Sequence, residues 1–182
     1  MAGRGDLESL VEVARAGSSA AWGKVYEALA PSVYRVSRRI LASREDAEDA
    51  TSEIFLKARL RLAQFDGTRP FAPWLYRVAA NHCWDEIRKR RGRREMDDPE
   101  PELVALEDRA PSPQEALVAV ESRASLRRVL GELDPRSRVA LVLRYYLDMS
   151  YEEIGQVLDI SANFVGVLLL RARRTLRKRM ET

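Results

Sequence analysis

The sequence predicts an all-α protein with two small helical domains joined by an acidic linker, the second being a helix-turn-helix domain. Apolar residues recur at three- and four-residue spacing along most of the chain, which is the period of an amphipathic helix. Ser, Asp and Pro precede several of these segments, as they do at helix starts. The stretch 95–113 breaks the pattern with acidic residues and prolines. We therefore expect domains at 1–94 and 112–182 and a linker at 95–111.

The composition limits the classes of function. The 182 residues have a net charge of +3, with 46% apolar and 32% charged residues, as in a globular chain. Basic residues form two clusters, at 88–94 and 171–179, which indicates a polyanion contacted at two places. One cysteine and one histidine exclude an internal disulfide and a structural zinc site. With no apolar run of membrane-spanning length and no signal peptide, we expect a cytoplasmic protein without membrane contact, metal, cofactor or catalytic residues.

Three helices are predicted before the first long loop. Asp6 is expected to cap the first helix, and Gly17 to end it. The second helix begins after Ser18 or Ser19, and Pro31 is expected to kink or split it.

The third predicted helix, capped by Ser43, has an inner face of small residues. Another of its faces carries an acidic line that ends in leucine: Asp46, Asp49, Glu53 and Leu56. From the helix alone, the acids are best interpreted as complementing the helix dipole.

The stretch 65–94 opens with a breaker-rich loop and continues as a helix with Pro73 in its first turn. One stripe of this helix is apolar and is expected to face the core. A second stripe combines cationic and amide side chains with one indole: Arg77, Asn81, Trp84, Arg88 and Arg91. This face suits phosphate contact and stacking on an unpaired base. The alternative is a solvated arginine face with the indole in the core; Phe65 and Phe71, which flank Arg69, favour nucleic-acid contact.

Capping signals predict the C-terminal domain. A capping box at 112–115 begins a helix that reaches Leu133, and Asp134-Pro135 begins the next. A second capping box, at 150–153, opens a short helix. Asp159 and Ile160 then turn the chain, and Ser161 caps a longer basic helix. A short helix, a tight turn and a basic helix are typical of the helix-turn-helix motif.

The stretch from Trp74 to Asn81, with Asp85 and the arginines behind it, resembles region 2 of extracytoplasmic-function sigma factors, the smallest class of bacterial sigma factor. The resemblance extends upstream through 44–50 and reappears at 150–155, in region 4. It implies a factor that directs core RNA polymerase to promoters and assists opening of the duplex, without catalysing a reaction itself. The implied partners are core polymerase, through the clamp helices of its largest subunit and its flap region, promoter DNA, and an anti-sigma factor.

The resemblance also implies roles for particular residues. The acidic line 46–56 would contact the clamp helices. The stretch 65–94 would contact the minus ten element, with one non-template base flipped into the loop between Phe65 and Phe71, and the C-terminal domain would contact the minus thirty-five element. The residues expected to contact DNA are Phe65, Arg69, Phe71, Arg77, Asn81, Trp84, Arg88, Arg91, Ser161, Asn163, Phe164, Arg171, Arg173 and Arg174. The linker is either a passive tether or a segment threaded through polymerase.

The last helix departs from the family pattern. Gly166, Val167 and Leu168 stand where the family has basic, serine and basic base readers, and Asp159 stands where it usually has glycine. An apolar outward face makes no bidentate hydrogen bond to a base, although it is able to contact thymine methyl groups. Burial of this face against another helix or a partner is the other interpretation, and both stay open.

Two other functions compete with this interpretation. A helix-turn-helix regulator that never joins polymerase explains 150–179 but leaves the acidic line and the stretch 65–94 without a role. A nucleic-acid enzyme lacks support, because His82 and Cys83 have no zinc spacing and the chain has no phosphate loop of the Walker type.

Overall fold

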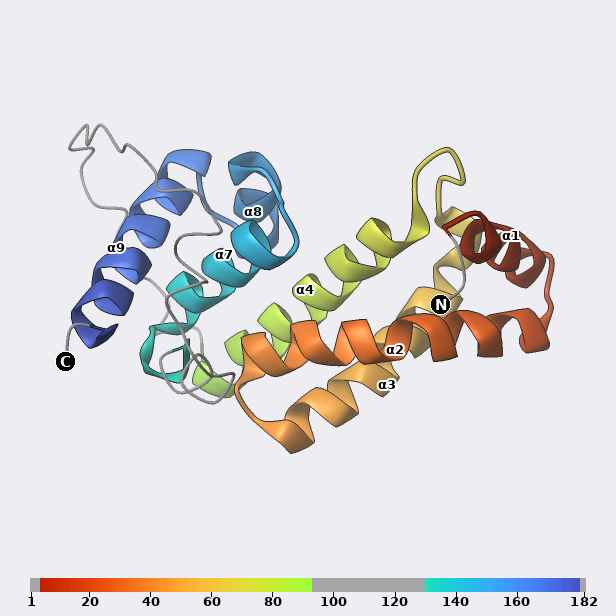
Figure 1. Cartoon of the computed structure of the whole chain (residues 1–182), viewed down its shortest axis with the longest axis horizontal. Helices are drawn as coiled ribbons and strands as arrows, with labels where there is room; N and C mark the ends of the chain where they lie inside the picture. Colours follow the sequence, from red (N-terminus) through yellow and green to blue (C-terminus); the bar gives the residue numbers. More distant parts are fainter. Residues whose placement is uncertain (1–3, 93–129, 181–182) are drawn as a thin grey trace. The chain divides into compact units, whose positions relative to one another are not determined.

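The structure, a computed structural model, describes residues 4–92 and 130–180, and all regular elements in these ranges are helices (Figure 1). The chain divides into two compact units, Met1–Cys83 and Trp84–Thr182. The predicted linker, the capping box at 112–115 and most of the helix after it lie outside the described residues, which resume at Leu130 near the end of that helix.

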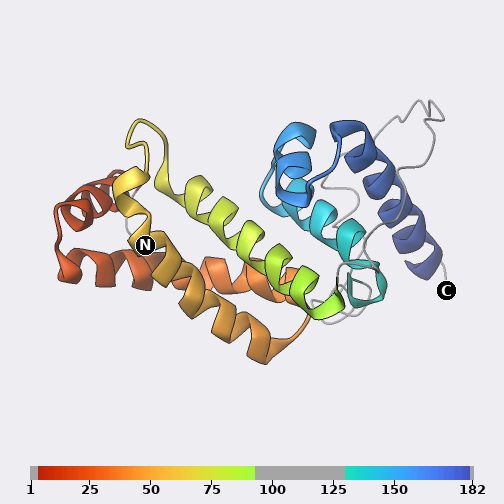
Figure 2. The same ribbon diagram turned by 180° about the vertical axis from the view of Figure 1, so that it is seen from behind.

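Helices of the first unit surround one core. Its elements are α1 (Arg4–Arg15), α2 (Ser19–Leu41), α3 (Arg44–Leu60), the 3-10 turn η1 (Leu62–Gln64) and α4 (Phe71–Arg91), which continues beyond the division between the units. α1 packs on α2, and α2 packs on α3. Seen from both sides, α4 runs beside α2 and α3 (Figures 1 and 2).

The predicted starts and stops of these helices are mostly confirmed. The Ser18 hydroxyl accepts the Ala21 N–H at 3.2 Å, and Ser43 caps α3 in the same way. Gly17 follows α1 with φ +104°, a left-handed conformation that glycine adopts without strain. The prediction that Asp6 is the N-cap is wrong: α1 begins at Arg4, so the carboxylate lies in the first turn, where it still faces the positive end of the helix dipole.

Pro31 does not split α2, which continues from Ser19 to Leu41. Proline removes the hydrogen bond to the carbonyl of Glu27, four residues earlier. Both residues are exposed, so that carbonyl lies on the side of the helix that water reaches. The interruption is therefore tolerated.

The core of the first unit follows the predicted stripes. The stripe of α2 is buried from Trp22 to Ile40, apart from Tyr26, which is 40% exposed. On α3 the small-residue inner face is also buried: Ala47, Ala50, Ile54 and Ala58. The Trp22 ring makes edge contacts with Phe55 of α3 and Phe71 of α4. An aromatic cluster thus joins three helices.

The second unit contains the predicted helix-turn-helix. Its described helices are α7 (Pro135–Tyr146), α8 (Tyr151–Leu158) and α9 (Ala162–Met180), which pack on one another. The chain bends by 93° between α8 and α9, within the usual range for this motif. In the described part of the chain, no single helix has the length and apolar composition of a membrane span, although the bent pair of α8 and α9 together does.

Candidate functional site

The acidic line of α3 is a solvent-exposed face. Asp49 and Glu53 are exposed, Asp46 is half-buried, and Leu56 is 61% exposed. The opposite face of the same helix is buried. A dipole role explains Asp46 in the first turn, but the effect of the dipole fades within that turn and does not account for the later positions.

The loop before α4 is ordered by its own side chains. The Asp66 carboxylate accepts both the Thr68 N–H at 3.0 Å and the Thr68 hydroxyl at 2.7 Å. These hydrogen bonds, together with weaker contributions from nearby arginines, lower the pKa of Asp66. The N–H of Arg69 donates to the Asp66 carbonyl at 3.2 Å, and its guanidinium points into solvent, 3.8 Å from the same carboxylate. The loop therefore presents one exposed cation.

A carboxylate from α1 caps the start of α4. The Phe71 N–H lies 3.1 Å and 3.3 Å from the two carboxylate oxygens of Glu8. Pro70 precedes this helix and has no side-chain acceptor for the cap, so a residue 63 positions away supplies it. Sequence patterns did not indicate this contact, because nothing local to either residue marks the pair.

The phenylalanines of the loop do not face solvent. Phe65 and Phe71 are 3% and 0% exposed, and they pack on each other and on Trp74 at ring-centroid distances of 5.2–5.3 Å. This burial corrects the assignment of Phe65 and Phe71 as residues that contact DNA. In the structure they form a buried aromatic cluster that supports the loop between them.

Trp84 is also buried, at 2% exposure, which corrects its assignment as a stacking residue. The inner stripe of α4 is wider than predicted, since Ala80 and Trp84 are buried beside the predicted Cys83 and Ile87. Its exposed stripe runs instead through Asn81, Asp85 and Arg88, with Arg77 half-buried one turn earlier. The Arg91 side chain lies outside the described atoms.

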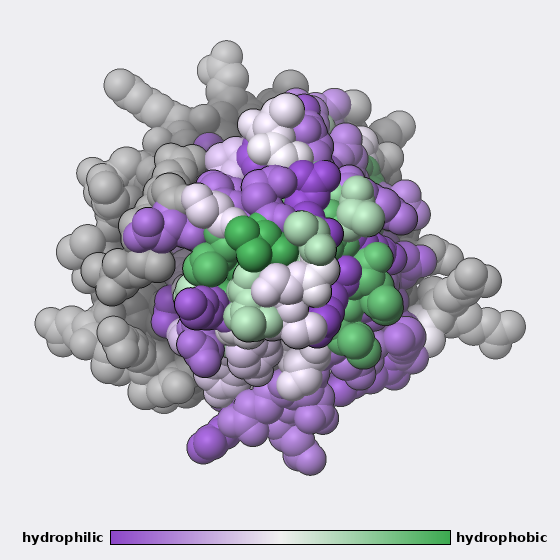
Figure 3. Space-filling model, turned by 90° about the vertical axis from the view of Figure 1, so that its right-hand side faces the viewer, coloured by the Kyte–Doolittle hydropathy of each residue, from purple (hydrophilic) through white to green (hydrophobic). Residues whose placement is uncertain are grey.

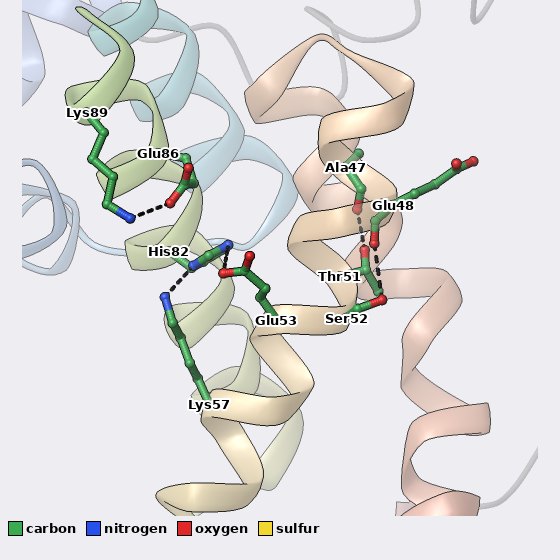
Figure 4. A network of polar contacts seen from close by, with 9 residues as sticks. All are labelled: Ala47, Glu48, Thr51, Ser52, Glu53, Lys57, His82, Glu86 and Lys89. Carbon is green, nitrogen blue, oxygen red and sulfur yellow. Dashed lines mark hydrogen bonds and ion pairs between the residues drawn. The ribbon is translucent and has the colours of Figure 1, made fainter. Parts of the chain in front are cut away.

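The single histidine joins α3 to α4. His82 lies on α4 beside the exposed Asn81, but its own side chain is buried. The Lys57 Nζ lies 2.6 Å from His82 Nδ1, and the His82 Nε2 lies 3.8 Å from the Glu53 carboxylate (Figure 4). Both partners belong to α3, one of them in the acidic line. The sequence patterns gave His82 no role beyond its lack of zinc-ligand spacing with Cys83.

The turn between α8 and α9 is formed as predicted. Ser150 and Glu153 make a complete capping box, with hydrogen bonds of 2.9 Å and 3.2 Å. Asp159 adopts the left-handed conformation at φ +56°, ψ +52°, as expected where the family has glycine. The Ser161 hydroxyl accepts the Phe164 N–H at 3.1 Å and so caps α9.

The outward face of α9 is narrower than predicted. Leu168 and Phe164 are each 3% exposed, so neither reaches a groove of DNA. This corrects the assignment of Phe164 to DNA contact, and for Leu168 it favours the alternative of burial against another helix. They belong to the buried stripe with Val165, Leu169 and Ala172. The face left to solvent begins with Asn163, passes through the half-buried Gly166, Val167 and Leu170, and continues in Arg171 and Arg174.

Arg173 differs from its neighbours on α9. It is half-buried, and its burial, followed by the like charge of Arg177, lowers its pKa from the usual value. Arg171 and Arg174 are exposed and are better placed for phosphate contact.

A partly apolar cavity lies where α1, α2 and α3 meet. Leu60 is 75% exposed and lines this cavity, which has a volume of about 170 Å³, together with apolar residues such as Trp22 and polar ones such as Arg59. Figure 3 faces this end of the first unit and shows apolar residues gathered among hydrophilic ones. Leu60 continues the line of Leu56 on α3, so this surface extends the acidic line.

Comparisons with known proteins agree with this geometry. The family model for sigma-70 region 2 matches residues 25–93, and the model for sigma-70 region 4 matches 123–176. The ECF RNA polymerase sigma factor SigW of Bacillus subtilis is 27% identical, with 96% of each chain covered. The RNA polymerase sigma factor CnrH of Cupriavidus metallidurans is 30% identical over 92% of this chain and 90% of its own. A solved structure of CnrH in complex with the cytosolic domain of CnrY aligns with a TM-score of 0.60 at 25% identity, covering 96% of each chain.

Proposed function

Because this chain belongs to the extracytoplasmic-function sigma factors of RNA polymerase, we propose that its exposed faces divide the work of transcription initiation. The protein is a sigma factor, which directs core polymerase to promoters and assists their opening. The rival interpretation as a regulator acting without polymerase has no support from these relatives. The polymerase carries out the chemistry, and the chain itself is proposed to be non-catalytic and to act in the cytoplasm.

The acidic line of α3 is the proposed polymerase contact. The observation that carries this proposal is the exposure of Asp49, Glu53 and Leu56 on a helix whose other side is fully packed. Carboxylates beside an exposed leucine suit a basic helical partner such as the clamp helices of the largest subunit, with the charges steering association. An anti-sigma factor is proposed to compete for the same faces, since the relative CnrH was solved with a domain of CnrY.

The promoter contacts are proposed on α4 and α9. Arg69 in the loop and Asn81 and Arg88 on α4 would contact the minus ten region, with the phenylalanine cluster holding the loop in place. Ser161, Asn163, Arg171 and Arg174 would contact the minus thirty-five region. Asn163 is the base reader best suited to adenine on this face, and the arginines would contact phosphates.

Charge reversal tests the polymerase contact. Asp49→Lys is expected to weaken core binding about tenfold or more, because a like charge then faces a basic partner. The matched control is Glu48→Lys, which makes the same change on another face of α3 and removes only the exposed pair with Arg44. The measurement is affinity for core polymerase, with circular dichroism to verify helicity. Equal effects of the two variants would show that only net charge matters and would remove the acidic line from the interface.

A further inference from the structure

We infer that His82 is a positioning residue for the polymerase-binding face, and that it ties Glu53 on α3 to the promoter-contacting helix α4. The inference rests on the proposed function of the acidic line. It starts from the buried imidazole between Lys57 and Glu53 (Figure 4).

The contact with Lys57 selects one tautomer of the imidazole. A lysine ammonium carries only donors, so the His82 Nδ1, at 2.6 Å from it, must be the acceptor. The ring is then neutral, and its proton lies on Nε2. A second proton on Nδ1 would place an N–H donor against the ammonium and is disfavoured. Lys57 therefore fixes both the protonation and the orientation of the ring.

The Nε2–H of this tautomer is on the side of the ring nearest Glu53. The distance of 3.8 Å between Nε2 and the carboxylate oxygen is too long for a hydrogen bond and makes this a dipole-to-charge contact. The Glu53 side chain is 60% exposed, whereas that of His82 is 2% exposed. One end of the contact is thus anchored in the core and the other reaches the surface.

Glu53 and Lys57 are one turn apart on α3, and the histidine comes from α4. The position of the Glu53 carboxylate therefore depends on where α4 lies. Asn81, the neighbour of His82, is exposed and belongs to the proposed promoter face. A shift of α4 on promoter binding would therefore move the Glu53 carboxylate. The affinity for polymerase would change as a result.

The first test is spectroscopic. Because the sequence holds one histidine, the ¹⁵N spectrum of the full chain labelled at histidine has a single pair of ring nitrogens. We expect one slowly exchanging neutral tautomer at neutral pH, with Nε2 protonated and Nδ1 unprotonated. A proton on Nδ1, or an average of both tautomers, would overturn the inference.

The second test is a double-mutant cycle on affinity for core polymerase. Glu53→Gln and His82→Leu are each expected to weaken binding about three- to tenfold, and the double variant no further, because the two residues act through one contact. His82→Gln, which keeps a donor toward Glu53, is expected to stay within about twofold of the unmodified chain. Cys83→Ala, a change at the adjacent buried position, controls for general loosening of α4 and is expected to leave affinity unchanged.

The outcomes separate the two proposals. If Glu53→Gln weakens binding but the histidine variants do not, or if the effects add, the positioning role fails and the acidic line stands. If Glu53→Gln has no effect, the polymerase contact at this position fails and the inference falls with it. If His82→Leu does not fold, the inference is tested by the affinity of His82→Gln and by the tautomer of His82. A loss of affinity in the folded His82→Gln variant overturns the inference.

Discussion

Two residues carry the geometry of the turn between α8 and α9. At Gly155 an added Cβ would lie 2.7 Å from the Ile160 carbonyl oxygen, a distance that forces the backbone to shift. The same pair makes a backbone hydrogen bond, from the Ile160 N–H to the Gly155 carbonyl, at 3.1 Å. Asp159 completes the turn in the left-handed conformation. Glycine is therefore needed for close approach at 155, while aspartate suffices at 159.

Alanine substitutions at two glycines are expected to have opposite effects. Gly155→Ala should destabilise the second unit by about 1–3 kcal/mol, because the methyl group meets backbone. Gly166→Ala is the matched control in α9: its Cβ would lie 3.5 Å from the Tyr151 ring, an ordinary contact, and alanine favours helix by about 0.5–1 kcal/mol. Thermal unfolding of both variants checks this. A stable Gly155→Ala variant would mean that the turn opens without cost.

Among the elements, α9 departs most from its sequence-based interpretation. Its apolar residues are divided by burial: Leu168 is in the core, whereas Val167 and Leu170 are half-buried. The spacing alone could not decide this, because a run of six apolar residues after Asn163, broken only by Gly166, fits more than one buried stripe. The packing of α7 and α8 on α9 decides which stripe is buried.

Because Val167 is half-buried and Leu168 is buried, arginine substitutions at these neighbouring positions of α9 are expected to have different effects. Val167→Arg should strengthen DNA binding and make it more dependent on salt, because it adds one cation to a face that already carries Arg171 and Arg174. Leu168→Arg should instead unfold the motif, since it buries an unpaired charge. The measurements are a binding titration on a promoter duplex at two salt concentrations and thermal unfolding. Stronger binding by a folded Leu168→Arg variant would show that this position faces DNA.

At the scale of the whole molecule, the proposed promoter-contacting surface of the first unit consists of exposed polar residues supported by buried aromatic ones. The order of the described helices, most of their starts and the helix-turn-helix were predictable, because caps and periodicity are local signals. The aromatic residues of the site were misassigned, since a ring next to arginines looks the same in sequence whether it faces base or core. Phe65, Phe71 and Trp84 are all buried. Contacts across the fold, such as Glu8 with Phe71, left no local signal.

The difference between exposed and buried residues of α4 predicts which substitutions impair promoter opening alone and which also impair binding to core polymerase. Asn81→Ala should reduce permanganate reactivity of the promoter bubble with little change in core affinity, since its side chain is exposed. Trp84→Ala should reduce both, because removing a buried indole costs about 3–5 kcal/mol of stability. A selective opening defect for Trp84→Ala, with unchanged stability, would return the indole to the promoter face.

The hydrogen bond between Glu8 and the Phe71 N–H also sets an order of events during synthesis. The carboxylate emerges from the ribosome first and has no such partner until the chain has grown by 63 residues. A contact of that sequence separation has a higher entropic cost of loop closure than the local caps at Ser18 and Ser43. The loop just before Phe71, which is proposed to contact the promoter, is therefore expected to take its final form after α1, α2 and α3 have assembled. Nascent chains that stop short of α4 would carry the proposed polymerase-binding face without the completed loop.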